Sequence, residues 1–535
     1  MNTQEIAGVL ELTSKLMELH NENPFKIRSL AAAAFKISKS GIELSGLSAA
    51  ELEKIEGIGK GIAQKIVEIT ETGTTHELSQ LKMKTPDGLS DLMEIKGLGP
   101  KKVGIIWREL GIESVGELEY ACNENRLVEL KGFGEKTQET IKKNLVFFNA
   151  NKNKLHFAYA IKVAEEITAL LRKHWPQRRI ELCGELYRKC ETISEIQILV
   201  SGAEENLPTS LGQIPVKFKI VFCPENEFTY RHFLVSSASE HLHKVNVNKL
   251  KRNDFSSEEE IYTDLELPFI APELREGLNE VDLAKEKKLP ELIEYFDLKG
   301  VLHNHSTYSD GMNTLKEMAD YCKSKGYEYF GIADHSQSAF YANGMKPERV
   351  LEQLEEINTL NASYTSFKVF KGIESDILND GRLDYSDDFL KSFDFVIASI
   401  HSNLRMDQEK ATARIIKAIE HPATRILGHP TGRLLLAREA YPIDHKKVID
   451  ACAANKVVIE LNAHPYRLDI DWRWIPYCME KNVLISINPD AHEKTAIADM
   501  YFGVCVARKG MLSKEHCLNA FTLLEFENWI LNGKK

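Results

Sequence analysis

The chain has 535 residues, 43% of them apolar and 27% charged, which is the composition of a soluble globular protein of three or four domains. No stretch approaches the roughly 20 apolar residues of a membrane span, and the nine cysteines, without a Cys-x-x-Cys pair, favour reduced thiols and a cytoplasmic location over a disulfide framework. The net charge of −11, with 19 basic against 22 acidic residues in residues 1–150, excludes a broad basic face, so any contact with nucleic acid must be local.

Residues 1–150 are predicted to be helical, because apolar residues recur at helical spacing and no alternating strand pattern occurs. A degenerate repeat, with Gly-x-Gly after an apolar residue and before a helix start, contains Gly57 and Gly59, Gly97 and Gly99, and Gly132 and Gly134. Such glycines let the chain turn tightly and bare the amides of a helix N-terminus, which can hold a phosphate.

The repeat resembles the helix-hairpin-helix motif, which grips DNA backbones without reading sequence. Three copies at spacings of 40 and 35 residues favour DNA binding through the six glycines. The alternative is a helical array in which the glycines only permit close packing.

Residues 151–290 combine a predicted helix near 157–174 with short strands near 179–183, 195–200 and 216–223. The acidic stretch 254–298 contains several prolines and is expected to form a small subdomain followed by a linker.

Seven short apolar runs between residues 300 and 492 are predicted to be buried parallel strands that alternate with helices. This alternation is the pattern of a β/α barrel, whose active site lies at the carboxyl ends of the strands. Six of the runs end in a possible metal ligand. His303 and His305 are separated by one residue, so on a strand both would face the same side.

The candidate ligands of this region are His303, His305, Asp310, His335, Glu374, His401, His429, Asp490 and His492. One histidine at a strand end is usually a packing or capping residue, but nine such residues in one domain indicate a metal site. Mixed imidazole and carboxylate ligands suit Zn, Mn or Fe.

These motifs resemble the PHP (polymerase and histidinol phosphatase) domain, a distorted seven-stranded barrel with three divalent metal ions that hydrolyses phosphoesters. The resemblance implies that His303, His305, Glu374 and Asp490 share one ion, that Glu374, His401 and His429 hold the second, and that Asp310, His335 and His492 hold the third. A metal-bound hydroxide would then be the catalytic nucleophile. Arg433 becomes a candidate phosphate contact, and its alternative role is a surface ion pair.

With helical hairpins before it, the whole chain resembles the bacterial family X DNA polymerases. Their palm motif is recognisable from Gly184 onward, but Glu195 and Gln197 stand where two Mg-binding aspartates are expected. Glu185 replaces a phosphate-holding serine, and the third aspartate falls near Lys219. Because nucleotidyl transfer needs carboxylates that bring two Mg ions to the triphosphate, the palm is predicted to be inactive.

Lys65 occupies the position of a Schiff-base lysine in related polymerases, although the neighbouring Tyr and Arg of that family are Leu30 and Ala31 here. A desolvated lysine could act as a lyase nucleophile. The alternative is a solvated helix residue.

The predicted fold class is multidomain: an all-α helix-hairpin-helix region, a small α+β palm-like domain and a C-terminal distorted (β/α)7 PHP barrel. The expected domains are 1–85 (helical, DNA-binding), 86–150 (fingers-like hairpins), 151–240 (degenerate palm), 241–290 (reduced thumb and linker) and 291–535 (PHP).

The predicted function is a DNA-repair phosphoesterase that acts as a 3′–5′ exonuclease, 3′-phosphatase or abasic-site nuclease on gapped or damaged DNA, without sequence preference. Three alternatives stay open: an active family X polymerase, a small-molecule phosphatase of the histidinol-phosphatase type, and a non-catalytic DNA-binding scaffold.

Overall fold

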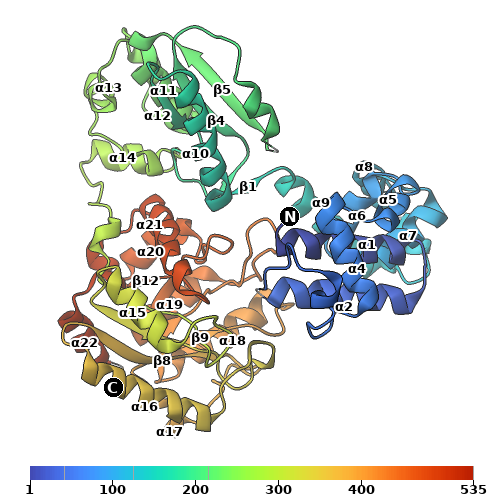
Figure 1. Ribbon diagram of the computed structural model, residues 1–535. Helices are drawn as coiled ribbons and strands as arrows, with labels where there is room; N and C mark the ends of the chain where they lie inside the picture. Colours follow the sequence, from blue (N-terminus) through green and yellow to red (C-terminus); the bar gives the residue numbers. More distant parts are fainter. Residues whose placement is uncertain (41, 124–125, 215, 534–535) are drawn as a thin grey trace. The chain divides into compact units, whose positions relative to one another are not determined.

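The computed structural model describes residues 1–40, 42–123, 126–214 and 216–533, and the chain divides into two compact units, Met1–Lys152 and Asn153–Lys535 (Figure 1). Within the described residues, no helix is long and apolar enough to cross a membrane.

The first unit is helical, as the apolar spacing predicted. Its helices are α1 (Thr3–Leu19), α2 (Pro24–Ser40), α3 (Ala49–Leu52), α4 (Lys60–Thr72), α5 (His76–Met83), α6 (Gly88–Glu94), α7 (Pro100–Leu110), α8 (Val115–Asn123), the 3-10 turn η1 (Arg126–Glu129) and α9 (Glu135–Asn151). The apolar face of each longer helix packs into one shared core.

The second unit begins with an α+β segment, residues 155–236. It consists of β1 (Leu155–His156), α10 (Phe157–His174), β2 (Ile180–Cys183), β3 (Thr192–Ile193), β4 (Ile196–Ser201), β5 (Phe218–Cys223) and α11 (Phe228–Ser236). Strand β4 lies between β2, which is antiparallel to it, and β5, which is parallel. The helix and the strands match the predicted positions closely. Three short helices follow: α12 (Ser239–Lys244), α13 (Glu258–Asp264) and α14 (Glu280–Lys285).

The rest of the unit is a seven-stranded parallel sheet in the order β12-β11-β10-β9-β8-β7-β6. The strands are β6 (Gly300–Val301), β7 (Tyr329–Ile332), β8 (Lys368–Asp376), β9 (Phe395–Ser399), β10 (Thr424–Leu427), β11 (Val458–Asn462) and β12 (Ile485–Asn488). The accompanying helices are α15 (Leu315–Ser324), α16 (Pro347–Ser363), α17 (Asp387–Leu390), α18 (Gln408–Glu420), α19 (His445–Asn455), α20 (Ile475–Glu480), α21 (Met500–Lys509) and α22 (Leu523–Leu531).

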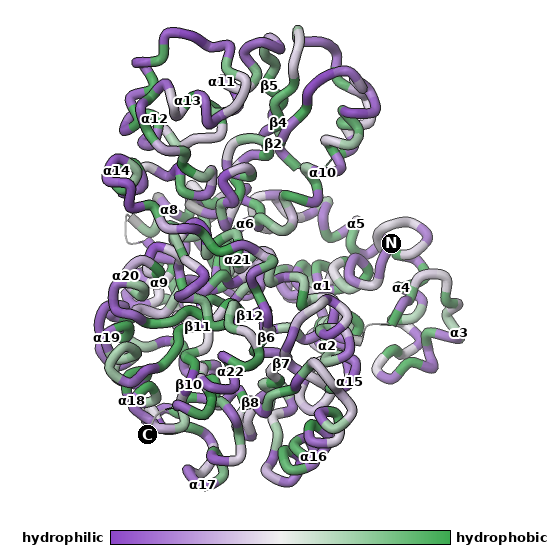
Figure 2. Tube along the Cα trace, turned by 90° about the vertical axis from the view of Figure 1, so that its left-hand side faces the viewer, coloured by the Kyte–Doolittle hydropathy of each residue, from purple (hydrophilic) through white to green (hydrophobic). Residues whose placement is uncertain are grey.

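The apolar runs form strands because both of their faces are covered. Every residue of β7, β9, β10, β11 and β12 is buried, and β10 and β11 are drawn largely green in Figure 2. A parallel bridge between Asn304 and Ala491, just beyond the ends of β6 and β12, brings the two edges of the sheet together. The sheet is therefore a nearly closed barrel, and the predicted fold class is confirmed.

The first barrel strand is shorter than predicted. Pairing ends at Val301, and His303 adopts a left-handed backbone with φ 56°. The argument that strand alternation would align His303 with His305 was therefore wrong, because the chain has already turned out of the strand. The two imidazoles still lie close, with ring centroids 5.3 Å apart.

Candidate metal centre and phosphate-binding hairpins

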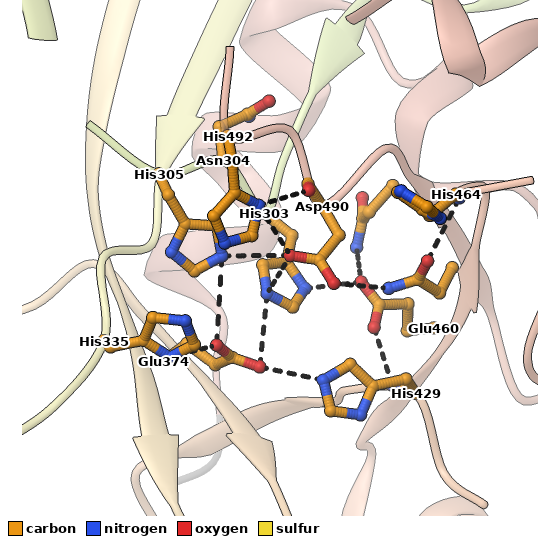
Figure 3. Close-up of polar contacts among 12 residues, drawn as sticks. His303, Asn304, His305, His335, Glu374, His429, Glu460, His464, Asp490 and His492 are labelled. Atoms are coloured by element: carbon orange, nitrogen blue, oxygen red, sulfur yellow. Dashed lines mark hydrogen bonds and ion pairs between the residues drawn. The ribbon is translucent and has the colours of Figure 1, made fainter. Parts of the chain in front are cut away.

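The nine candidate ligands lie near or beyond the carboxyl ends of barrel strands, and the fold brings them into one cluster. Figure 3 shows His303, His305, His335, Glu374, His429, Asp490 and His492 facing one another. The strands are parallel, so their carboxyl ends open on the same mouth of the barrel. His305 and Asp490 are 185 residues apart in sequence, yet His305 Nε2 and Asp490 Oδ1 lie 3.0 Å from each other.

Glu374, which β8 carries into the mouth, is the centre of this cluster. Its Oε1 lies 3.3 Å from His303 Nε2, 3.2 Å from His401 Nε2 and 3.0 Å from His429 Nε2. Its Oε2 lies 2.8 Å from His335 Nδ1. Burial disfavours the charged carboxylate, but the surrounding imidazoles outweigh burial and hold the pKa of Glu374 well below its ordinary value.

Three overlapping groups in the cluster have ligand atoms within 4.8 Å of one another: His303, His305 and Asp490; His305, Asp310, His335 and His492; and His335, Glu374 and His401. The family resemblance paired His429 with Glu374 and His401. His429 Nε2 lies 3.3 Å from His401 Nε2, so this arrangement too is within reach.

The donor atoms fit divalent cations. Among the described residues, His303 Nε2, His305 Nδ1 and Glu374 Oε2 are buried and have ion-pair contacts with neighbouring candidate ligands, but none of them makes a well-aligned hydrogen bond. Buried polar atoms are normally satisfied, so such a set is typical of atoms meant for another partner. Imidazole nitrogens and carboxylate oxygens without thiolates are donors for Zn, Mn or Fe.

The charges of the cluster depend on one another. Burial disfavours charged imidazoles, but Glu374 and Asp376 raise the pKa of His401 to about 10, and Asp310 and Asp490 raise that of His492 to about 9. Protons on these rings balance the carboxylates in the metal-free protein. A bound cation would take the place of such protons.

Two carboxylates that the sequence analysis did not select contact imidazoles of the cluster through their Nδ1 atoms. Glu460, on β11, accepts a hydrogen bond from His303 Nδ1 at 2.6 Å, and Asp376 lies 2.5 Å from His401 Nδ1. Each of these contacts orients an imidazole so that its Nε2 faces the cluster. Asp376 was detectable, because it follows Glu374 by two residues on the same face of a strand. Glu460 was harder to detect, because a single acidic residue near the end of an apolar run is common in strands without a functional site.

Three cluster residues have positive φ: His303 (56°), His429 (21°) and Asp490 (52°). Non-glycine residues rarely adopt this conformation, and it concentrates at functional sites. Each of the three lies two residues beyond the end of its strand, where the chain turns at the mouth of the barrel.

The Arg433 guanidinium donates to Asp471 at 2.8 Å, to the Arg467 carbonyl at 3.0 Å and to the Leu468 carbonyl. Its side chain is largely buried, so the ion pair with Asp471 is not a surface pair. The role of Arg433 as a phosphate contact stays a prediction. Arg467, which the sequence analysis missed, lies closer to the cluster: its Nε is 3.7 Å from Asp490 Oδ2.

The palm positions lie together in the α+β segment. Gln197 and Lys219 are register partners on β4 and β5, and Gln197 donates to Glu195 at 3.1 Å. Glu195 also lies 3.6 Å from the Lys217 ammonium. Glu185 accepts from the amide of Ser194 at 2.5 Å. This strand pair therefore presents one carboxylate beside an amide and two lysines.

The three Gly-x-Gly repeats share one geometry. The first glycine has a left-handed φ of 91°, 88° or 90°, and the second is the N-cap of α4, α7 or α9 without a side-chain cap. The apolar residue between them is buried: Ile58, Leu98 or Phe133. Burying such a side chain contributes about 1.5–3 kcal/mol, which anchors each turn. No side chain caps the N-terminal amides of these three helices.

Lys65, on α4, forms an ion pair with Glu77 at 2.6 Å and is largely covered, so it is not the solvated residue of the alternative interpretation. Glu77 also pairs with Lys26. The role of Lys65 as a lyase nucleophile stays a prediction.

A mouth of clustered imidazoles and carboxylates on a parallel barrel is the site of a metal-dependent phosphoesterase of the PHP class. A PHP domain profile matches residues 302–464, a helix-hairpin-helix domain profile residues 1–75, and a SAM-like helix-hairpin-helix tandem profile residues 89–145.

Among relatives, the DNA polymerase/3′-5′ exonuclease PolX of Bacillus subtilis (strain 168) is 33% identical over 570 residues, covering 99% of both chains. Probable phosphatases of Acetivibrio thermocellus and Shewanella frigidimarina are 28% and 29% identical, over 31% and 30% of this chain and 65% and 62% of theirs. The protein therefore belongs to the bacterial family X DNA polymerases that carry a C-terminal PHP domain.

Proposed function

We propose that the PHP barrel of this chain hydrolyses phosphodiester bonds at DNA 3′ ends, and that the helical hairpins hold the DNA by its backbone. The observation that carries the proposal is the position of Glu374, buried among the imidazoles of His303, His335, His401 and His429. The relative in Bacillus subtilis is named as a 3′-5′ exonuclease, which agrees with this assignment.

The nine ligands are proposed to hold three divalent ions, Zn, Mn or Fe. When bound, such ions lower the pKa of water and stabilise charge on a phosphate. The chain's own contribution is to fix the donors: Glu460 and Asp376 hold His303 and His401 by their Nδ1 atoms. Arg467 adds a positive charge at the rim, beside Asp490, where a phosphate could be bound.

The proposal also covers the parts that surround the barrel. Residues 1–85 and 86–150 would bind DNA without sequence preference, 151–240 would be a degenerate palm, 241–290 a reduced thumb and linker, and 291–535 the phosphoesterase. The N-termini of α4, α7 and α9, which have glycine N-caps and no side-chain cap, support the binding role.

The test is degradation of 5′-labelled DNA by purified protein with Mn. His303→Ala or Glu374→Gln should abolish hydrolysis, while circular dichroism shows that the helices of the first unit remain folded. DNA degradation at the wild-type rate by either variant would refute the assignment.

We further propose that the palm-like region has lost nucleotide addition. Gln197 cannot supply charge, and Lys219 beside it would compete with a metal ion. Arg188, the arginine that follows Glu185 in the palm motif, is already paired with Glu276 at 3.0 Å. Glu276 also binds Lys509 of α21 at 2.6 Å, so this turn of the palm serves as an attachment to the barrel. Misplacing a metal by about 1 Å can cost ~100-fold in rate, and here most of the site's negative charge is missing.

Primer extension on gapped DNA with Mg or Mn should fail even in the His303→Ala variant, in which the nuclease cannot mask slow synthesis. Extension by that variant would overturn the proposed loss and restore the polymerase interpretation, without affecting the nuclease proposal.

A further inference from the structure

The loop after β11 places an exposed aromatic ring and a cation together at the mouth of the barrel. Tyr466 is 51% exposed, and Arg467, the next residue, lies 3.7 Å from Asp490. The loop starts at Asn462, whose amide donates to Asp490 Oδ2 at 3.1 Å, and returns to the strand through the pairing of Asn462 with Asp469. Arg467 therefore lies beside the candidate ligand Asp490, and Tyr466 precedes it on the same loop.

The ring is held in place by the α+β segment. His156, at the end of β1, lies against Tyr466 with ring centroids 4.3 Å apart, and its Nε2 is 2.9 Å from the Leu435 carbonyl. The Leu435 amide donates to the Tyr466 carbonyl at 2.7 Å. His464, at the edge of the cluster in Figure 3, meets the ring edge-on at 5.3 Å. The ring is therefore fixed on one side by His156 and His464, and about half of the Tyr466 residue stays open to a flat partner.

A nucleotide has the two groups that this arrangement would bind. Any of the four bases can stack on an aromatic ring, and a guanidinium binds the phosphate on the 5′ side of the same nucleotide. We propose that Tyr466, backed by His156, is the stacking platform for the base at the 3′ end of the strand, and that Arg467 contacts its phosphate. The α+β segment then completes the nuclease site. This inference rests on the proposed function of the barrel.

The test compares two single strands that differ only at the 3′ end, one with a normal nucleotide and one with an abasic residue. The wild-type protein should cut the base-bearing end with a kcat/KM about 5- to 100-fold higher, the range expected for one stacked base. Tyr466→Leu should bring the ratio of the two ends towards one, and Tyr466→Trp should preserve it. His156→Ala should lower the ratio by removing the backing ring, while the control Tyr477→Leu, on α20, should leave it unchanged.

A second measurement does not depend on cleavage. In full-length His303→Ala protein, the fluorescence of a 3′-terminal 2-aminopurine should be quenched on binding, and the added Tyr466→Leu change should remove the quenching. If Tyr466→Leu leaves the ratio of the two kcat/KM values unchanged, even with both values lowered equally, the stacking platform is refuted and the proposed function of the barrel still stands. Failure of the wild-type protein to degrade either strand would refute the proposed function and the platform with it.

Discussion

Glu460 provides the sharpest test of how the barrel prepares its ligands. Its carboxylate is completely buried and faces three donors. Oε1 accepts from His303 Nδ1 at 2.6 Å and from Asn488 Nδ2 at 3.0 Å, and Oε2 accepts from the His429 amide at 2.6 Å. Glu460→Gln keeps the shape of the side chain but replaces one acceptor by an NH2 group. In either orientation of that amide, a donor then faces a donor.

The size of the effect follows from these contacts. A buried donor left without its acceptor costs about 1–3 kcal/mol. If the amide turns towards His303, the imidazole loses the partner that fixes its Nδ1 proton and directs Nε2 into the cluster. Loss of such a supporting contact typically lowers metal affinity 10- to 100-fold, or about 1.4–2.8 kcal/mol, which agrees with the first estimate. We therefore expect weaker Mn binding and a matching loss of hydrolysis at limiting Mn.

The assay is a Mn titration by calorimetry, with DNA hydrolysis followed over the same Mn range. Glu439→Gln, at an exposed position of the same domain, is the matched control and should behave as wild type. Wild-type Mn affinity in Glu460→Gln would refute the argument that this carboxylate orients His303 for metal binding.

Three other predictions follow from the described contacts. Gly99→Ala should weaken DNA binding at least about tenfold in fluorescence anisotropy, because the new methyl group has space within the protein but would obstruct a phosphate, whereas Gly116→Ala should not. Because the raised pKa of His401, about 10, keeps a proton on this ring in the metal-free protein, calorimetry should show metal affinity rising with pH towards 10, about tenfold per unit for each proton displaced. Arg275→Ala should destabilise the protein by about 3–5 kcal/mol in urea denaturation, because buried Arg275 pairs with Glu258 at 2.7 Å. Burial disfavours the Glu258 carboxylate, but His232 and Arg275 lower its pKa to about 2, so this contribution should persist above pH 4.5 and disappear as the pH falls towards 2. A flat pH profile of metal affinity, or wild-type stability without Arg275, would contradict the respective prediction.

The order of the elements and the class of the fold were determined by the sequence alone, because both depend on local patterns. Apolar runs alternating with helical spacing predicted the barrel, and the Gly-x-Gly repeats predicted tight turns before helices. The positions of the nine candidate ligands near strand ends were visible for the same reason, since the hydrophobic pattern indicates each strand and its approximate end.

Tertiary structure alone decided how those ligands face one another. The left-handed backbone of His303 ended its strand early, and this was invisible because the conformation is imposed by contacts such as that with Glu460, 157 residues away. The burial of Arg433 against Asp471, and the approach of His156 to Tyr466, likewise depend on segments far apart in sequence. Local patterns specify which segments become strands, but the exact strand end and the partners of a side chain are set by packing between distant segments, which no single stretch of sequence contains.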